Sequence, residues 1–225
     1  ATEGRFQLAE AEGTLWNGSA LPVLTGGPGS RDAALLPSRL SWQLRPVWFG
    51  LSLAVSQPCC MTQPVALRWE PGWGSAHLSI LPQGELIGVW PAALLEGLGA
   101  PFNTLKPGGQ LRLSSKALSL HSTGGAWRLS GEAELQLLQT SSRLSTVSPL
   151  GSYRITLTGL DQQPSAIALR TLDGALQLQG QGELRPRGLY FRGNAQAAPG
   201  QEPALNNLLN IIGRRQGASS VISIG

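Results

Sequence analysis

The sequence predicts a mainly β protein, organised as one long, strongly curved and mostly antiparallel sheet with two short capping helices. Three observations support this fold class. Apolar residues alternate with polar ones in many segments, turn residues separate those segments, and the 225 residues include 29 glycines and 16 prolines. Alternation with a period of two is typical of strands that bury one face and expose the other. We therefore expect half-buried strands along most of the chain.

The alternation is clearest in residues 40–44, where Leu40, Trp42 and Leu44 share one face. Further strands are expected around Leu111 and Leu113, Leu118 and Leu120, Ala133, Leu135 and Leu137, and Tyr153, Ile155 and Leu157. Turns between strands are indicated by Pro107-Gly108-Gly109, Thr123-Gly124-Gly125 and Asp173-Gly174.

A short strand element recurs at residues 14–24, 126–137, 175–186 and 189–199. Each copy has apolar residues two apart and then a glycine, followed by a small residue two positions later. The shared glycines are Gly18, Gly131, Gly180 and Gly193. Because a glycine inside a strand marks a bulge, a bend or close packing, the repetition predicts strong curvature of a single sheet.

Two stretches depart from the β pattern and predict short helices at about 91–98 and 203–213. Each has a proline at a plausible first helical position and a glycine after its last turn. Leu205, Leu208 and Leu209 share one face of the second helix. Because both helices are amphipathic, we expect them to cap the apolar side of the sheet.

The chain is expected to form a single β-rich domain over residues 1–225. The two helices suggest two similar halves, 1–105 and 106–225, which share one continuous sheet. No apolar run approaches the ~20 residues that a membrane-spanning helix needs.

The composition argues against several classes of function. Charged residues make up 13% of the chain, about half of the ~25% usual in soluble domains. The net charge is +4, but most arginines are scattered, whereas a nucleic-acid binder concentrates them on one face or run. We expect no nucleic-acid partner.

No catalytic, cofactor or metal motif is present. The two histidines, His77 and His121, lie in predicted strands without a recognisable nucleophile. Zinc needs about four ligands, and no Cys or His spacing supplies them. We therefore expect no enzyme, no catalytic residue, no cofactor and no metal site.

The seven tryptophans all lie within the first 127 residues. Aromatic rings of this kind either stack on sugars or bases, or fill the apolar face of a sheet. We favour the second interpretation, because their spacing follows strand alternation.

Five segments carry a resemblance to a known family: GTLWNGSA (13–20), LSWQLRP (40–46), GAPFNTLKPGGQLRL (99–113), SPLGSY (148–153) and ALNNLLNIIGRRQG (204–217). In their order and spacing over nearly the whole chain, they resemble the type II secretion system protein N family. SPLGSY and the end of the last segment are the most specific.

The resemblance implies a single-pass inner-membrane protein of a Gram-negative bacterium, with this domain in the periplasm and an N-terminal membrane anchor that is absent from this chain. It implies a non-enzymatic role in exporting folded proteins across the outer membrane. The implied partners are other secretion subunits, either inner-membrane components or the secretin.

The chain is also distantly similar to AsmA-like β-rich envelope proteins, whose long curved sheets have an apolar trough. This fold-level analogy gives an alternative function, in which the concave apolar face binds or transfers lipid.

Cys59 and Cys60, the two cysteines, are adjacent. A redox enzyme would use C-x-x-C, and the implied periplasm is an oxidising compartment. Adjacent Cα atoms lie ~3.8 Å apart, below the usual ~4.4–6.8 Å of a disulfide, so that a bridge requires a strained ring. We expect a loop tip with either a vicinal disulfide or two thiols, incidental to function, and favour the disulfide.

Arg214 and Arg215 follow the second predicted helix. Their guanidinium groups are candidates for binding partner carboxylates or lipid phosphates. Alternatively, they only interact with the negative end of the helix dipole, and we favour this second interpretation.

Overall fold

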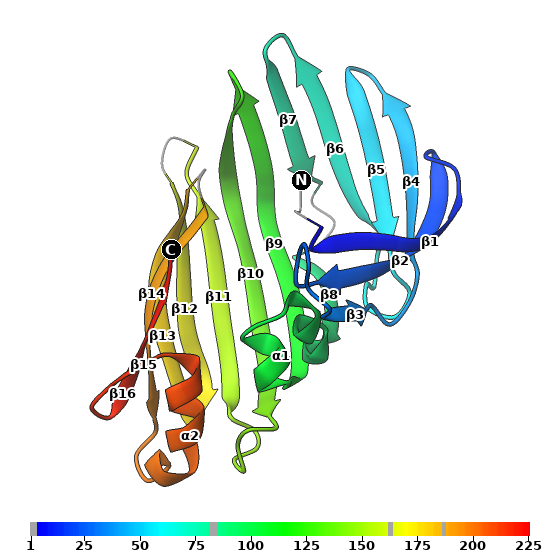
Figure 1. Ribbon diagram of the computed structural model, residues 1–225. Coiled ribbons are helices and arrows are strands. Elements are labelled where there is room, and N and C mark those ends of the chain that lie inside the picture. Colours follow the sequence, from blue (N-terminus) through cyan, green and yellow to red (C-terminus); the bar gives the residue numbers. More distant parts are fainter. Residues whose placement is uncertain (1–3, 82–84, 162–163, 186–187) are drawn as a thin grey trace.

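The protein is described here by a computed structural model that covers residues 4–81, 85–161, 164–185 and 188–225 (Figure 1). It is mainly β, with 16 strands in one large antiparallel sheet that is not closed, and this confirms the predicted fold class. The strands are β1 (Phe6–Gly13), β2 (Asn17–Thr25), β3 (Ala33–Leu35), β4 (Leu40–Val47), β5 (Gly50–Ser56), β6 (Val65–Gly72), β7 (Ser75–Ile80), β8 (Leu86–Pro91), β9 (Pro107–Thr123), β10 (Ala126–Ser142), β11 (Gly151–Gly159), β12 (Ser165–Gly174), β13 (Leu176–Arg185), β14 (Gly188–Ala197), β15 (Arg214–Gln216) and β16 (Ser219–Ile224).

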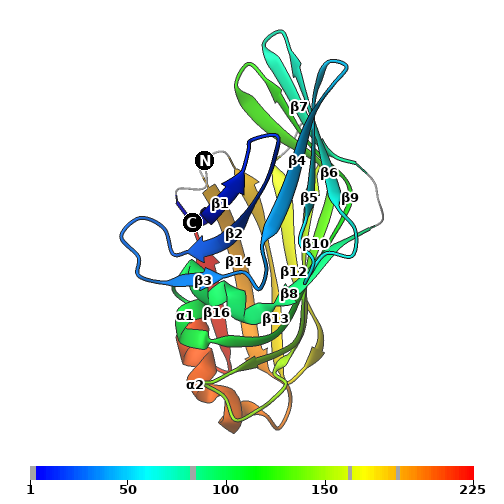
Figure 2. The ribbon, with the colours of Figure 1, turned by 90° about the vertical axis from the view of Figure 1, so that its right-hand side faces the viewer.

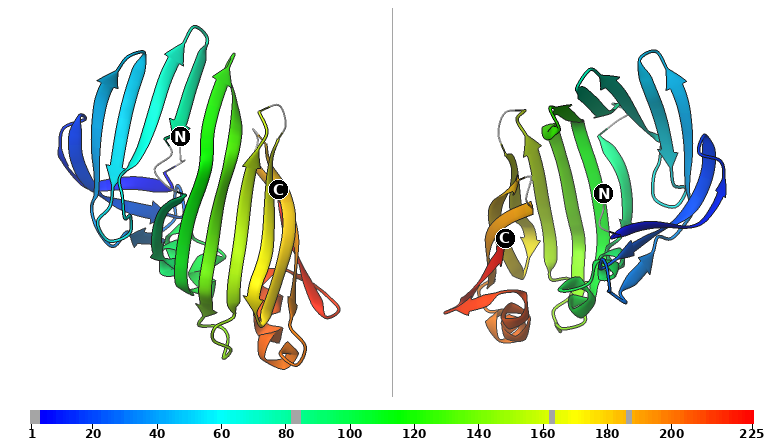
Figure 3. Two further views of the ribbon diagram at one scale, coloured as in Figure 1. Left: turned by 180° about the vertical axis from the view of Figure 1, so that it is seen from behind. Right: turned by 45° about the horizontal axis from the view of Figure 1, so that its top comes forward.

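The order of strands across the sheet follows the chain closely. It runs β1-β2-β4-β5-β6-β7-β9-β10-β11-β12-β13-β14-β16-β15, with β3 paired to β2 and β8 paired to β9. Most strands therefore pair with their neighbours in sequence through short turns. In Figures 1 and 3 the sheet curves, and its two ends turn toward one side.

The strand β9 pairs with three neighbours. One edge follows β10, from Ala126 opposite Thr123 to Ser142 opposite Pro107. The other edge is shared, because β7 pairs with Ser119–Thr123 and β8 pairs with 110–114. The N-terminal and C-terminal strands therefore meet at β9.

Two bulges bend the β9–β10 hairpin. The first lies where Ala117 and Gly131 have φ of 49° and 97°, and the register shifts between Ser130 and Glu132. A Cβ at Gly131 would lie 2.3 Å from the Ala117 carbonyl oxygen, so this position requires glycine. The glycine at this copy of the repeated element therefore marks a bulge.

The prediction of a turn at Pro107-Gly108-Gly109 is wrong, because these residues begin β9. Gly109 has φ of 106°, and a second register shift lies opposite, between Leu138 and Ser141. Gly108 and Gly109 permit this bulge, and the pairing of β9 with β10 continues on both sides of it. The predicted turn at Thr123-Gly124-Gly125 does connect two strands, at Gly124 and Gly125. Asp173 and Gly174 do not form the predicted turn, because they end β12 in register with β11, and the chain passes to β13 at Ala175.

Three short helices accompany the sheet. The first predicted helix is the 3-10 helix η1 (Ala92–Leu98), and the second is the α-helix α2 (Glu202–Ile212). A further helix, α1 (Phe102–Leu105), was not predicted. Figure 2 shows α1, α2 and the strands β1–β3 on one side of the sheet.

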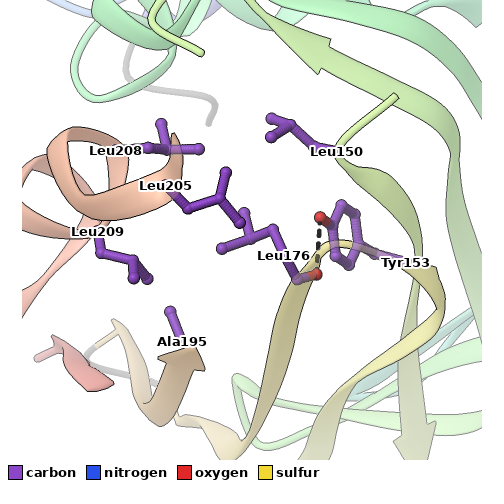
Figure 4. Packing of buried hydrophobic residues seen from close by; sticks show 7 residues of the cluster. All are labelled: Leu150, Tyr153, Leu176, Ala195, Leu205, Leu208 and Leu209. Atoms are coloured by element: carbon purple, nitrogen blue, oxygen red, sulfur yellow. Dashed lines mark hydrogen bonds between the residues drawn. The ribbon is translucent and has the colours of Figure 1, made fainter. Parts of the chain in front are cut away.

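The best-buried cluster lies where α2 covers the C-terminal strands (Figure 4). It consists of Leu150, Tyr153, Leu176, Ala195, Leu205, Leu208 and Leu209. The Tyr153 hydroxyl donates a hydrogen bond of 3.1 Å to the Leu176 carbonyl oxygen. Burial, reinforced by the negative charge of Asp173, raises the pKa of Tyr153 well above its ordinary value, so that the hydroxyl remains a donor.

We predict that Leu205→Ala lowers the free energy of unfolding by about 2–5 kcal/mol, because it leaves a cavity under α2. Leu205 has no exposed surface, whereas Ile211 on the same helix is 39% exposed. The control Ile211→Ala should change the same quantity by about 0.5 kcal/mol or less. Urea denaturation followed by circular dichroism measures both, and equal losses would show that α2 does not pack as described.

Candidate interaction surface

We call the parts of β4–β7, β9 and β10 that extend beyond the helices the upper strands (Figure 1). One face of these strands is apolar. By register, one row consists of Leu44, Leu53, Leu67 and Ile80. The next row consists of Pro46, Leu51, Trp69, Leu78, Leu120 and Leu129. We call these two rows, together with Trp127, the upper apolar face.

The helices do not seal the upper apolar face. η1 packs mainly against β2, β3 and β9, and α2 packs against β14, β15 and β16. Trp69 is 40% exposed and Trp127 is 54% exposed, and the leucines between them are only half-buried. An apolar surface that spans several adjacent strands without full burial marks a site of interaction.

The opposite face of the same strands is polar. Arg45, Ser52 and Arg68 form one row by register, and Glu70, His77, His121 and Arg128 form the next. The Glu70 carboxylate forms an ion pair of 3.0 Å with Arg68 and lies 3.3 Å from the ring nitrogen of His77. The upper part of the sheet is therefore amphipathic.

The two histidines lie side by side on this polar face, with ring centroids 5.8 Å apart. The hydrogen-bonding partner of the His77 ring is the Glu70 carboxylate, at 3.3 Å. In the part of the chain that the structure describes, no group of three His, Cys, Asp or Glu residues is placed to hold a metal ion.

The tryptophans correct the sequence-based interpretation. Five of them are exposed: Trp16 (53%), Trp48 (83%), Trp69 (40%), Trp73 (105%) and Trp127 (54%). Trp16, Trp48 and Trp73 lie in turns, where strand alternation no longer determines which side a residue faces. Trp42 and Trp90 are half-buried, as expected of residues that fill the sheet.

The open sheet ends in two edge strands, β1 and β15. Seven of the eight residues of β1 are exposed, whereas β15 has only three residues. An edge strand presents backbone N–H and C=O groups along its outer side, which a partner strand can use. β1 is the longer of the two and the better candidate for strand addition.

The arginines Arg214 and Arg215 lie in β15, beyond the end of α2. The Arg215 guanidinium donates a 2.7 Å hydrogen bond to the side chain of Asn206 on α2, not to a carbonyl at the end of the helix. The last turn of α2 contains no basic residue. A role of this pair in contacting a partner or lipid stays a prediction.

Arg214 belongs to a polar row on the other side of the sheet from α2. By register, this row passes the apolar Val221 and continues through the polar residues Asn194, Gln179 and Arg170. A hollow of about 780 Å³ lies over these strands, lined partly by Arg170, Gln179 and Asn194. The alternating polar residues of the last strands were the only signal in the sequence for this feature.

Cys59 and Cys60 lie in the connection between β5 and β6, where the sequence predicts a loop, and they form a disulfide. The amides of Cys60 and Met61 donate to the Gln57 carbonyl oxygen at 3.1 and 2.9 Å, and the Cys60 carbonyl accepts from the Val89 amide at 2.8 Å. This turn is therefore tied to β8.

Gln57 connects this turn to the rest of the sheet. Its side chain is 1% exposed. It accepts a 2.7 Å hydrogen bond from the Trp90 indole and donates one of 2.9 Å to the Ser38 carbonyl oxygen. The disulfide thus lies next to a buried polar contact, far from the tips of the upper strands.

A comparison with known families finds one match. The family model described as type II secretion system (T2SS), protein N matches residues 4–223. No curated protein and no solved structure matches the chain. Among the described residues, no helix has the length and apolar character required to cross a membrane.

We predict that the unfolded protein takes up no alkyl group until a reductant is added, because Cys59 and Cys60 form a disulfide. Mass spectrometry of the unfolded protein, alkylated with and without reductant, measures this directly. The reduced sample is the control and should take up two alkyl groups. Uptake of two groups without reductant would show two thiols instead of a bridge.

Proposed function

Because this chain belongs to the type II secretion system protein N family, we propose that it is a non-enzymatic periplasmic component that assists the export of folded proteins across the outer membrane. It acts through contacts with other secretion subunits, either inner-membrane components or the secretin. The main support for this proposal is the family membership of the chain. The exposed edge strand β1 and the unsealed upper apolar face support it, because both offer surface to a partner.

The proposed location is the inner membrane, with this domain in the periplasm and a single anchor N-terminal to it. The Cys59–Cys60 disulfide supports the periplasmic part of the proposal, because disulfides persist in oxidising compartments.

The chain is proposed to act as one domain of two similar halves, 1–105 and 106–225. Residue 105 ends α1, directly before β9 begins at Pro107. The continuous strand order across β9 supports one shared sheet.

A second candidate function is the binding or transfer of lipid. The specific observation in its favour is the upper apolar face, where Trp69 and Trp127 keep much of their surface exposed. Acyl chains bind to such surfaces because burial of apolar area is favourable. The analogy with AsmA-like proteins points to the same face but concerns only the fold.

We predict that a photo-crosslinker in place of Leu8, which is 47% exposed on β1, captures a secretion subunit in cells that express the anchored protein and the secretion system. Mass spectrometry identifies the captured partner. The matched control replaces Arg112, an exposed residue of the central strand β9, and should capture less. Capture of no secretion subunit from any surface position would contradict the proposal.

For the lipid alternative, we predict that the purified protein carries acyl chains that native mass spectrometry detects. Leu78→Glu should abolish this binding, since it places a charge on the upper apolar face. Ser79→Glu, one residue along β7 and on the polar face, is the matched control and should retain the lipid. A lipid-free protein that also excludes added phospholipid would eliminate this alternative.

A further inference from the structure

Among the residues that the structure describes, the three most exposed large apolar side chains, Trp73, Trp48 and Phe49, lie in turns at one end of the strands. The hairpins β4–β5, β6–β7 and β9–β10 all turn at this end of the sheet (Figures 1 and 3). Trp48 and Phe49 form the first turn, Trp73 lies in the second, and Trp127 follows the third. We call Trp48, Phe49 and Trp73 the tip aromatics.

The tip aromatics are almost fully in water. Trp48 is 83% exposed, Phe49 is 82% exposed and Trp73 is 105% exposed. The rings of Trp48 and Phe49 lie beside each other, with centroids 5.9 Å apart. Aromatic side chains bury a large apolar area when they are covered, so three of them at neighbouring tips indicate a surface that covers them.

The charges behind the tips have one predominant sign. Arg45 and Arg128 are both exposed, close in sequence to Trp48 and Trp127. Glu70, the acidic residue of this region, forms an ion pair with Arg68. The region therefore has an excess of positive charge that attracts an anionic surface.

We propose that the tip aromatics insert into the headgroup region of a lipid bilayer that contains anionic lipid. Trp is enriched at membrane interfaces, and arginines a short distance behind it attract anionic lipids. The two separate turns that hold the tip aromatics can enter a deformable surface together without matching pockets in a partner. Insertion stops at the headgroups, because the polar backbone of the turns needs hydrogen-bonding partners that hydrocarbon does not supply.

This proposal is independent of the secretion role and of the lipid alternative. The upper apolar face would hold individual acyl chains along the strands, whereas the tip aromatics contact the surface of a membrane. The two sets of residues differ, so that variants separate them. A protein that loses vesicle binding through its tips should keep any lipid bound on the upper apolar face.

The test uses the purified chain and vesicles of phosphatidylcholine and phosphatidylglycerol. The variant combines Trp48→Ser, Phe49→Asn and Trp73→Ser. Asn suits position 49, where φ is 61°, because it tolerates this conformation better than most residues. The side chains are exposed, so the variant should fold, and circular dichroism checks this.

We expect the variant to bind these vesicles at least about tenfold more weakly in co-sedimentation, since partial burial of one aromatic side chain gives about this factor. In the native protein, brominated lipid should quench the tryptophan emission. The matched control Trp16→Ser removes a tryptophan that is 53% exposed in the β1–β2 turn, and it should bind like the native chain.

Charge supplies a second measurement. Arg45→Gln and Arg128→Gln should each weaken binding to vesicles with phosphatidylglycerol by about fivefold. Neither should change the weaker binding to pure phosphatidylcholine.

The proposal is overturned if the native chain does not bind vesicles, or if the tip variant binds as well as the native chain. It is also overturned if Trp16→Ser weakens binding as much as the tip variant does. Self-association that requires the tip aromatics, detected by analytical ultracentrifugation without vesicle binding, would identify a second copy of the chain as the occupant instead.

Discussion

The pairing of β9 with three neighbouring strands is the constraint on which the rest of the structure depends. β10 pairs along one edge of β9, and β7 and β8 divide the other. Among the described residues, the strands β1–β7 and β10–β16 therefore belong to one sheet only through the hydrogen bonds of β9. The bulges beside Gly109 and Gly131 bend this hairpin while the ladder continues.

The curvature of the sheet and the positions of the helices explain which strands keep an uncovered apolar surface. The C-terminal strands receive α2 and bury a compact leucine cluster with Tyr153. Near the N-terminus, the helix η1 covers β2 and β3 and also packs against β9. The upper strands receive neither helix, so that their apolar rows stay half-buried and their turns project freely. The candidate surfaces for a lipid and a membrane follow from this arrangement, whereas the edge strand β1 is a candidate for a partner because the sheet is not closed.

Much of the fold could be predicted because alternation is a local property of the sequence. Leu40, Trp42 and Leu44 indicated β4 correctly, and two prolines located the helices to within about a residue. Pro107-Gly108-Gly109 led to the wrong prediction of a turn. The same residues permit a turn or a bulge, and only the partner strand decides between the two. The register of β9 with two strands on one edge depends on contacts distant in sequence, which no local pattern contains.

The candidate site was harder to predict than the fold. Trp48 continues the alternation of Leu40, Trp42 and Leu44, but β4 ends at Val47 and the side chain enters solvent. Trp69 does follow the alternation, and yet it remains 40% exposed because no element covers its face. Alternation indicates which face is apolar, but it does not indicate whether that face is covered.

Hydrogen exchange of the native protein, resolved by peptide, tests most directly whether β9 unites the sheet. Our account predicts that 110–114 and 119–123 exchange only through global unfolding, together with β10. Exchange of β4–β7 with 119–123 through a separate opening, while β10–β14 stay protected, would contradict it.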